Sequence, residues 1–91
     1  MRVFKEYLLD EKILSIQTLY LPSSAEVVNI LKTTAGLKLL VIVKHASYEQ
    51  EPLELHKYQI CVNDEIFYTN TVKYIGSFES DVGVKHVIEV D

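Results

Sequence analysis

Three pairs of neighbouring histidine and lysine residues come closest to a chemical motif in this sequence. Lysine ammonium groups and protonated imidazoles bind anions such as phosphate, and the pairs are Lys44-His45, His56-Lys57 and Lys85-His86. Neighbouring side chains on a strand point to opposite faces, so one pair cannot act as one site. An anion site would need residues from different pairs to meet across strands. For each residue alone, the more common role is a solvated lysine or a hydrogen-bonded core histidine.

The other reactive side chains do not form a recognisable catalytic or metal motif. Cys61 is the only cysteine and lies in an alternating apolar stretch, where a buried structural thiol is more common than a nucleophile. His45, His56 and His86 could supply three imidazoles to zinc, but they lack the short spacings typical of zinc ligands. The sequence has neither a Gly-x-Ser-x-Gly elbow nor a Gly-rich phosphate loop. We therefore predict a protein that is not an enzyme, with no catalytic residue, metal or cofactor.

Composition favours one cytoplasmic globular domain spanning residues 1–91. The 91 residues are 48% hydrophobic and 24% charged, which is typical of a folded domain and too short for two. A net charge of -4 argues against a general nucleic-acid-binding surface, which is normally basic. The longest apolar run, 37–43, falls far short of the roughly 20 residues that cross a membrane. A small domain without a disulfide suits a reducing compartment, and the first residues lack the apolar stretch of a signal peptide.

Most of the chain alternates apolar and polar residues, which is the pattern of strands with one buried face. The alternating stretches are 2–9, 13–21, 53–62, 72–78 and 84–90. Pro22 ends the second of them because proline cannot donate to a sheet ladder. The nearly continuous apolar run 37–43 predicts a central strand covered on both faces.

Turn signals separate these stretches. Asn63-Asp64 indicates a two-residue hairpin, because both residue types tolerate positive φ, and the return strand would begin at 66–68. The segment 81–83, Asp-Val-Gly, indicates a second tight turn. The segment 45–52 is predicted to be a polar loop.

The segment 25–34 is ambiguous between helix and strand. Ser23 with Glu26 resembles a capping box, and Val27, Val28 and Leu31 then fit a short helix. The segment is also rich in β-branched residues, which favour a strand. Strand is the preferred interpretation.

These patterns predict an all-β fold, or a β-rich α+β fold with at most one short helix. The expected architecture is a small antiparallel β sandwich or barrel of six to eight short strands. Exposed edge strands in so small a domain invite pairing between chains. We therefore expect a homo-oligomer, with a dimer as the smallest closed form.

Several short motifs resemble the DUF7352 family of small bacteriophage proteins. They are Lys5 with Tyr7, Gln17-Thr18-Leu19-Tyr20-Leu21-Pro22, Ala25-Glu26-Val27-Val28, Leu39 to Val43, Tyr74-Ile75-Gly76-Ser77 and Val84-Lys85-His86-Val87. The chain departs from the family pattern in having no Trp, with Lys85 before the late histidine. It also has Cys61-Val62-Asn63-Asp64 in place of a Thr-Gly-His segment. The resemblance implies a phage product, but no activity, because none is established for that family.

The leading functional hypothesis is a non-enzymatic phage protein that sequesters a small nucleotide signal of host immunity. The residues expected to contact such an anionic ligand are Lys44, His45, Tyr48, Lys57 and Lys85. Tyr48 is included because a tyrosine in a polar loop offers a ring for stacking and a hydroxyl. The alternative is a protein-interaction module that inhibits or remodels a host or phage protein.

Overall fold

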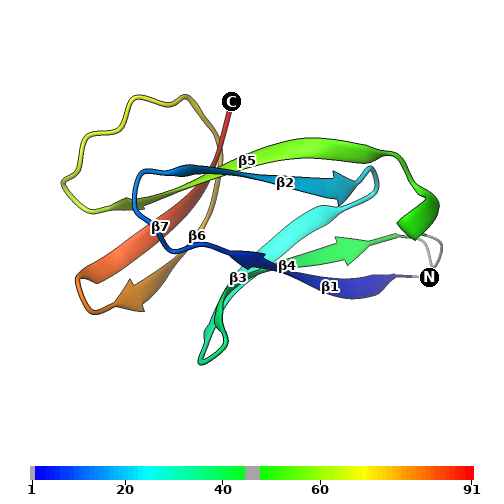
Figure 1. Ribbon diagram of the computed structural model, residues 1–91, viewed down its shortest axis with the longest axis horizontal. Coiled ribbons are helices and arrows are strands. Elements are labelled where there is room, and N and C mark those ends of the chain that lie inside the picture. Colours follow the sequence, from blue (N-terminus) through cyan, green and yellow to red (C-terminus); the bar gives the residue numbers. More distant parts are fainter. Residues whose placement is uncertain (1, 45–47) are drawn as a thin grey trace.

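The computed structural model describes residues 2–44 and 48–91, and strands make up most of it (Figure 1). The strands are β1 Val3–Leu9, β2 Ile16–Pro22, β3 Glu26–Thr33, β4 Gly36–Val43, β5 Leu53–Val62, β6 Thr71–Ser80 and β7 Gly83–Val90. The one helical element among the described residues is a 3-10 turn, η1 Tyr48–Gln50. The predicted all-β fold of six to eight short strands is therefore confirmed. Within the described residues, no helix is long and apolar enough to cross a membrane.

The seven strands form two antiparallel sheets that pack face to face as a sandwich. The first sheet has the order β1-β4-β3, and the second has the order β2-β5-β7-β6. The chain passes from the first sheet to the second between β1 and β2 and returns between β2 and β3, as the blue-to-cyan path in Figure 1 shows. Along one side of the sandwich, β3 contacts β6.

The main core lies between the two sheets. The first sheet contributes Leu9, Ile30 and the alternate residues of β4, and the second sheet contributes Leu21, Tyr58, Ile60, Phe78 and Val87. The alternate residues of β4 are Leu37, Leu39, Val41 and Val43, all fully buried. The side chains between them on β4 are only half-buried. The strand is central, but the prediction that both of its faces are covered is wrong, because the second sheet packs on one face only.

The ambiguous segment is strand β3, so the helical alternative for it is wrong. Antiparallel pairing with β4 satisfies its backbone groups, and Ile30 enters the core opposite Leu39. A β-bulge between Val27 and Asn29 places one extra residue, Val28, on the surface. This bulge breaks strict alternation, which is why apolar neighbours in the sequence resembled a helical spacing.

Strand β2 begins later than the alternation suggests. Leu14 has a φ of 62°, which is outside the range of extended backbone. Its N–H donates to the Ile60 carbonyl at 2.8 Å, and its carbonyl accepts from the Gln59 side-chain amide at 2.9 Å. These two bonds hold the residue against β5 and delay the start of the strand to Ile16.

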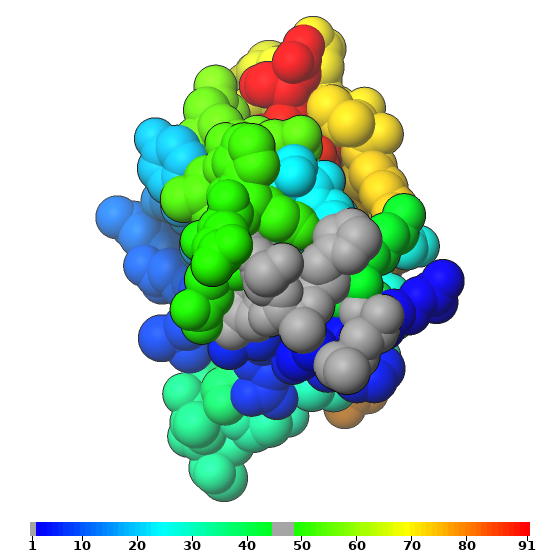
Figure 2. Space-filling model, turned by 90° about the vertical axis from the view of Figure 1, so that its right-hand side faces the viewer, coloured from blue at the N-terminus to red at the C-terminus, as the bar shows by residue number. Residues whose placement is uncertain are grey.

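The prediction of a hairpin at Asn63-Asp64 is wrong, because the turn there does not connect two paired strands. A turn does form there, with Asp64 at a φ of 66°. However, the chain continues through the non-strand segment 63–70, because β7 occupies the place beside β5. The carbonyl of Asn70 accepts from the Asp91 N–H at 3.0 Å. In Figure 2 the C-terminus (red) accordingly lies beside the yellow residues of this region.

The second predicted tight turn is confirmed. Ser80 pairs with Gly83, so a two-residue loop of Asp81 and Val82 joins β6 to β7. Gly83 has a φ of 107°, a conformation that side chains with a Cβ rarely adopt. The Ser80 hydroxyl donates to the Gly83 carbonyl at 2.8 Å and closes the loop.

Candidate functional site

The structure does not bring together the three predicted anion-binding lysines, which all lie among the described residues. Lys44 directly follows β4, where its N–H donates to the Ser24 hydroxyl at 3.2 Å. Lys57 pairs with Val90 and lies on the outer face of the second sheet. Lys85 pairs with Phe78 and Val62 on the opposite face, at the other end of the β5–β7 ladder.

Two further predicted contacts cannot be placed. His45 lies outside the described residues, and so does the side chain of Tyr48, the first residue of η1. The hypothesis of a zinc site is not supported either, because two of its three histidines, His56 and His86, lie on opposite faces of the second sheet. The described residues contain no group of three or more His, Cys, Asp or Glu side chains that could hold a metal ion.

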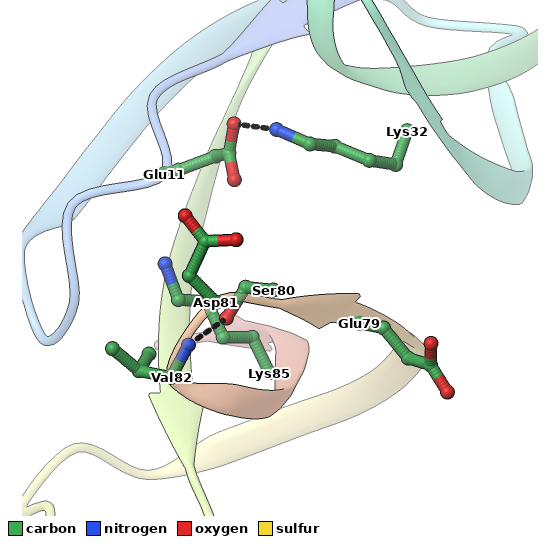
Figure 3. Close-up of a pocket in the computed structure, with 7 residues that line it drawn as sticks. All are labelled: Glu11, Lys32, Glu79, Ser80, Asp81, Val82 and Lys85. Atoms are coloured by element: carbon green, nitrogen blue, oxygen red, sulfur yellow. Dashed lines mark hydrogen bonds and ion pairs between the residues drawn. The ribbon is translucent and has the colours of Figure 1, made fainter.

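Lys85 lines a pocket of about 450 Å³ beside the β6–β7 turn, called here the hairpin pocket (Figure 3). Its lining residues are Glu11, Lys32, Glu79, Ser80, Asp81, Val82 and Lys85. Lys32 forms an ion pair with Glu11. In Figure 3, Asp81 and Lys85 both extend toward this pair, whereas Glu79 points away.

The charges of the hairpin pocket nearly cancel. Two lysines and three carboxylates line it, Glu79 points away from it, and one lysine is already paired with Glu11. Lys85 makes no ion pair with another described residue. A multiply charged anion such as a nucleotide would therefore meet one unpaired ammonium but also the like charges of Glu11 and Asp81.

A hydrogen-bonded chain of Tyr74, His86 and Asn63 lies on the outer face of the second sheet. His86 Nε2 is 2.6 Å from Asn63 Oδ1, and His86 Nδ1 is 2.9 Å from the Tyr74 hydroxyl. Since Asn63 Oδ1 only accepts, Nε2 of the neutral ring carries the proton, and Tyr74 donates to Nδ1. These two hydrogen bonds tie Asn63 to β6 and β7, which gives His86 a structural role.

Cys61 is the cross-strand neighbour of His86, but its setting does not activate the thiol. The side chain is 3% exposed and packs with Ile88 and Val90 in a small second cluster. Burial, and secondarily the negative charge of Glu65, raises the pKa of Cys61 above its ordinary value. A raised pKa lowers the fraction of thiolate, which is the nucleophilic form.

A second histidine cluster lies where the inner face of the second sheet meets solvent. His56 Nδ1 is 3.3 Å from Glu89 Oε2, and its Nε2 is 3.9 Å from Glu54 Oε2. The His56 ring stacks on Tyr58, with centroids 6.4 Å apart. This cluster covers one end of the core, and both imidazole nitrogens already face carboxylates.

Exposed apolar side chains on the outer faces are the feature that reasoning about charged residues missed. On the second sheet, four exposed apolar residues share the outer face of β2 and β5 and are called here the lateral patch: Ile16, Tyr20, Leu53 and Leu55. Tyr20 and Leu55 are direct cross-strand partners and are 62% and 51% exposed. In the sequence, the signal for this surface is that both the even-numbered and the odd-numbered positions of one strand carry apolar residues.

The fold and its surfaces define a small two-sheet β sandwich without an assembled reactive centre among the described residues. No family model matches the chain, and no curated protein or solved structure matches it.

Proposed function

We propose that this chain is a non-enzymatic binding protein whose partner is another protein, held on the lateral patch. The observation that carries the proposal is the exposure of Tyr20 beside Leu55, with Leu53 next along β5 and Ile16 on the same face beyond Thr18. Exposed apolar groups around an aromatic residue are typical of protein interfaces. Lys57 and Thr18 pair directly on the same face between Tyr20 and Ile16, and they supply polar contacts within the patch.

The resemblance to a phage family extends the proposal to a biological setting. A phage product in the cytoplasm of its host would act on a host protein, which it inhibits or remodels by covering part of that protein's surface. Such an activity needs stoichiometric binding and no catalytic group, in keeping with the buried thiol of Cys61.

Replacing Tyr20 and Leu55 together with serine should weaken binding of the partner by at least about ten-fold, since buried interface anchors each contribute more than about 1 kcal/mol. The partner is sought by capture on the immobilised full chain from host extract and quantified by mass spectrometry. Val72→Ser with Val82→Ser is the matched control, because both valines are exposed and lie outside the patch. If every captured protein is retained equally by the two double variants, the lateral patch is not the binding surface.

A small anionic ligand in the hairpin pocket is the second candidate function. It is favoured by Lys85, which extends into the pocket without an ion pair to another described residue. A nucleotide held there should raise the melting temperature of the wild-type protein by a few degrees through preferential binding to the folded state. Lys85→Ala should abolish that shift, and heating should release the nucleotide unchanged. A nucleotide panel that leaves the melting temperature constant rules out this candidate.

A further inference from the structure

Strand β1 is an edge strand that neither a bulge nor a proline protects. Natural sheets protect their edges with bulges, prolines, charged side chains or covering elements, and on β1 Lys5 is such a charge. Strands β3 and β6 both contain bulges and contact each other, and β2 ends at Pro22. In contrast, all seven residues of β1 pair with β4 in unbroken register, and the strand contains neither proline nor glycine.

Apolar surface is exposed at the end of β1 and on its outer face. An open groove of about 680 Å³ adjoins the C-terminal end of β1, and its apolar lining includes Leu8, Leu9, Leu19 and Leu37. On the outer face, Phe4 and Leu8 are 66% and 65% exposed. Figure 2 shows residues of this N-terminal strand (dark blue) reaching the surface at one end of the molecule.

We propose that β1 pairs with β1 of a second copy of this chain, antiparallel and about a two-fold axis at Glu6. The two three-stranded sheets then become one sheet of six strands. The sequence of β1 fits this pairing because the register that uses its whole length places Phe4 opposite Leu8 of the partner subunit. Leu8 likewise meets Phe4 of the partner subunit, so the two most exposed apolar side chains of the strand pack against each other.

The charges on the same face also fit a second copy. At the axis, Glu6 would meet Glu6 of the partner subunit, and like charges directly opposite each other are destabilising. Lys38 offsets this repulsion, since its Nζ lies 3.3 Å from Glu6 Oε2 within the same chain. Each carboxylate thus brings its own counter-ion, and the axis carries no net charge. This pairing does not depend on the lateral patch, which belongs to the second sheet.

A cysteine at the axis tests the pairing directly. Facing residues of an antiparallel pair have Cα atoms within the range that a disulfide spans, so Glu6→Cys should oxidise rapidly to a covalent dimer. Tyr68→Cys is the control, because that position is 92% exposed and lies in the segment 63–70, away from β1. The natural Cys61 is buried and should not cross-link. Rapid cross-linking at position 6 alone supports the proposal, and equal rates at positions 6 and 68 overturn it.

A charge exchange tests the register. Phe4→Glu and Leu8→Lys should each weaken the dimer about ten-fold, measured as the dissociation constant by analytical ultracentrifugation, since each removes two apolar cross-strand pairs. The double variant should recover affinity, because Glu at position 4 then faces Lys at position 8 of the other copy. Leu55→Lys, on the lateral patch, should leave the dissociation constant unchanged. A monomer at all concentrations, a dimer without recovery in the double variant, or occupation of β1 by a strand from another protein would each overturn the proposal.

Discussion

Leu39→Ala should reduce the free energy of unfolding by about 2–5 kcal/mol, the range measured when a large buried aliphatic side chain is truncated. Leu39 is fully buried at the centre of β4, between Tyr7 on β1 and Ile30 on β3. A domain of this length has a total stability on the order of 5–15 kcal/mol. The substitution would therefore remove a large part of it. Urea denaturation followed by circular dichroism measures the change.

Leu40→Ala is the matched control for that substitution. Leu40 is the next residue of the same strand, but it lies half-buried on the outer face between Glu6 and Asn29. Less apolar area is removed from water there, so we expect a loss below about 1 kcal/mol. Equal losses for the two variants would mean that both faces of β4 are covered, and the two-layer architecture would be wrong.

Tyr58→Phe should stabilise the protein, and the gain should grow at alkaline pH. The Tyr58 side chain is fully buried in the core, and its hydroxyl has no hydrogen-bond partner among the described residues. A buried hydroxyl without a partner carries an uncompensated loss of hydration, so its removal should add about 1 kcal/mol near neutral pH. Urea denaturation of both proteins between pH 8 and pH 11 measures the effect.

The alkaline dependence follows from the ionisation of the phenol. Burial first, and the negative charge of Glu89 second, raise the pKa of Tyr58 well above its ordinary value. Above roughly pH 10 the unfolded chain releases this proton while the folded protein retains it, so stability falls by about 1.4 kcal/mol per pH unit. Tyr58→Phe should lack this contribution, whereas Tyr68→Phe, at an exposed position, should decline as the wild type does. Parallel alkaline curves for wild type and Tyr58→Phe would show that the phenol is hydrated in the folded state.

Local sequence patterns were sufficient to predict most of the strands and one of the tight turns. Alternation along β1 and β2 depends on each strand having one face in the core, and that constraint acts within a single strand. The turn at Asp81-Val82-Gly83 was equally local, because Gly83 supplies the positive φ that its loop requires. These features need no knowledge of which strands are neighbours.

Errors arose wherever the outcome depended on a distant part of the chain. The run 37–43 appeared to be covered on both faces, but only the second sheet could decide which face of β4 is buried. The turn at Asn63-Asp64 was followed by residues suited to a strand, yet β7 takes the position beside β5. Non-local pairing of this kind is selected by the total burial of both sheets.

By itself, the sequence determined that the chain forms short strands, because apolar and polar residues alternate with the two-residue period of a strand within single segments. Only the tertiary structure decided that Lys57 and Lys85 lie on opposite faces and that Tyr20 and Leu55 form one exposed surface. The physical reason is that a side chain's neighbours across a sheet are set by strand order and register. Both result from packing two sheets over one core.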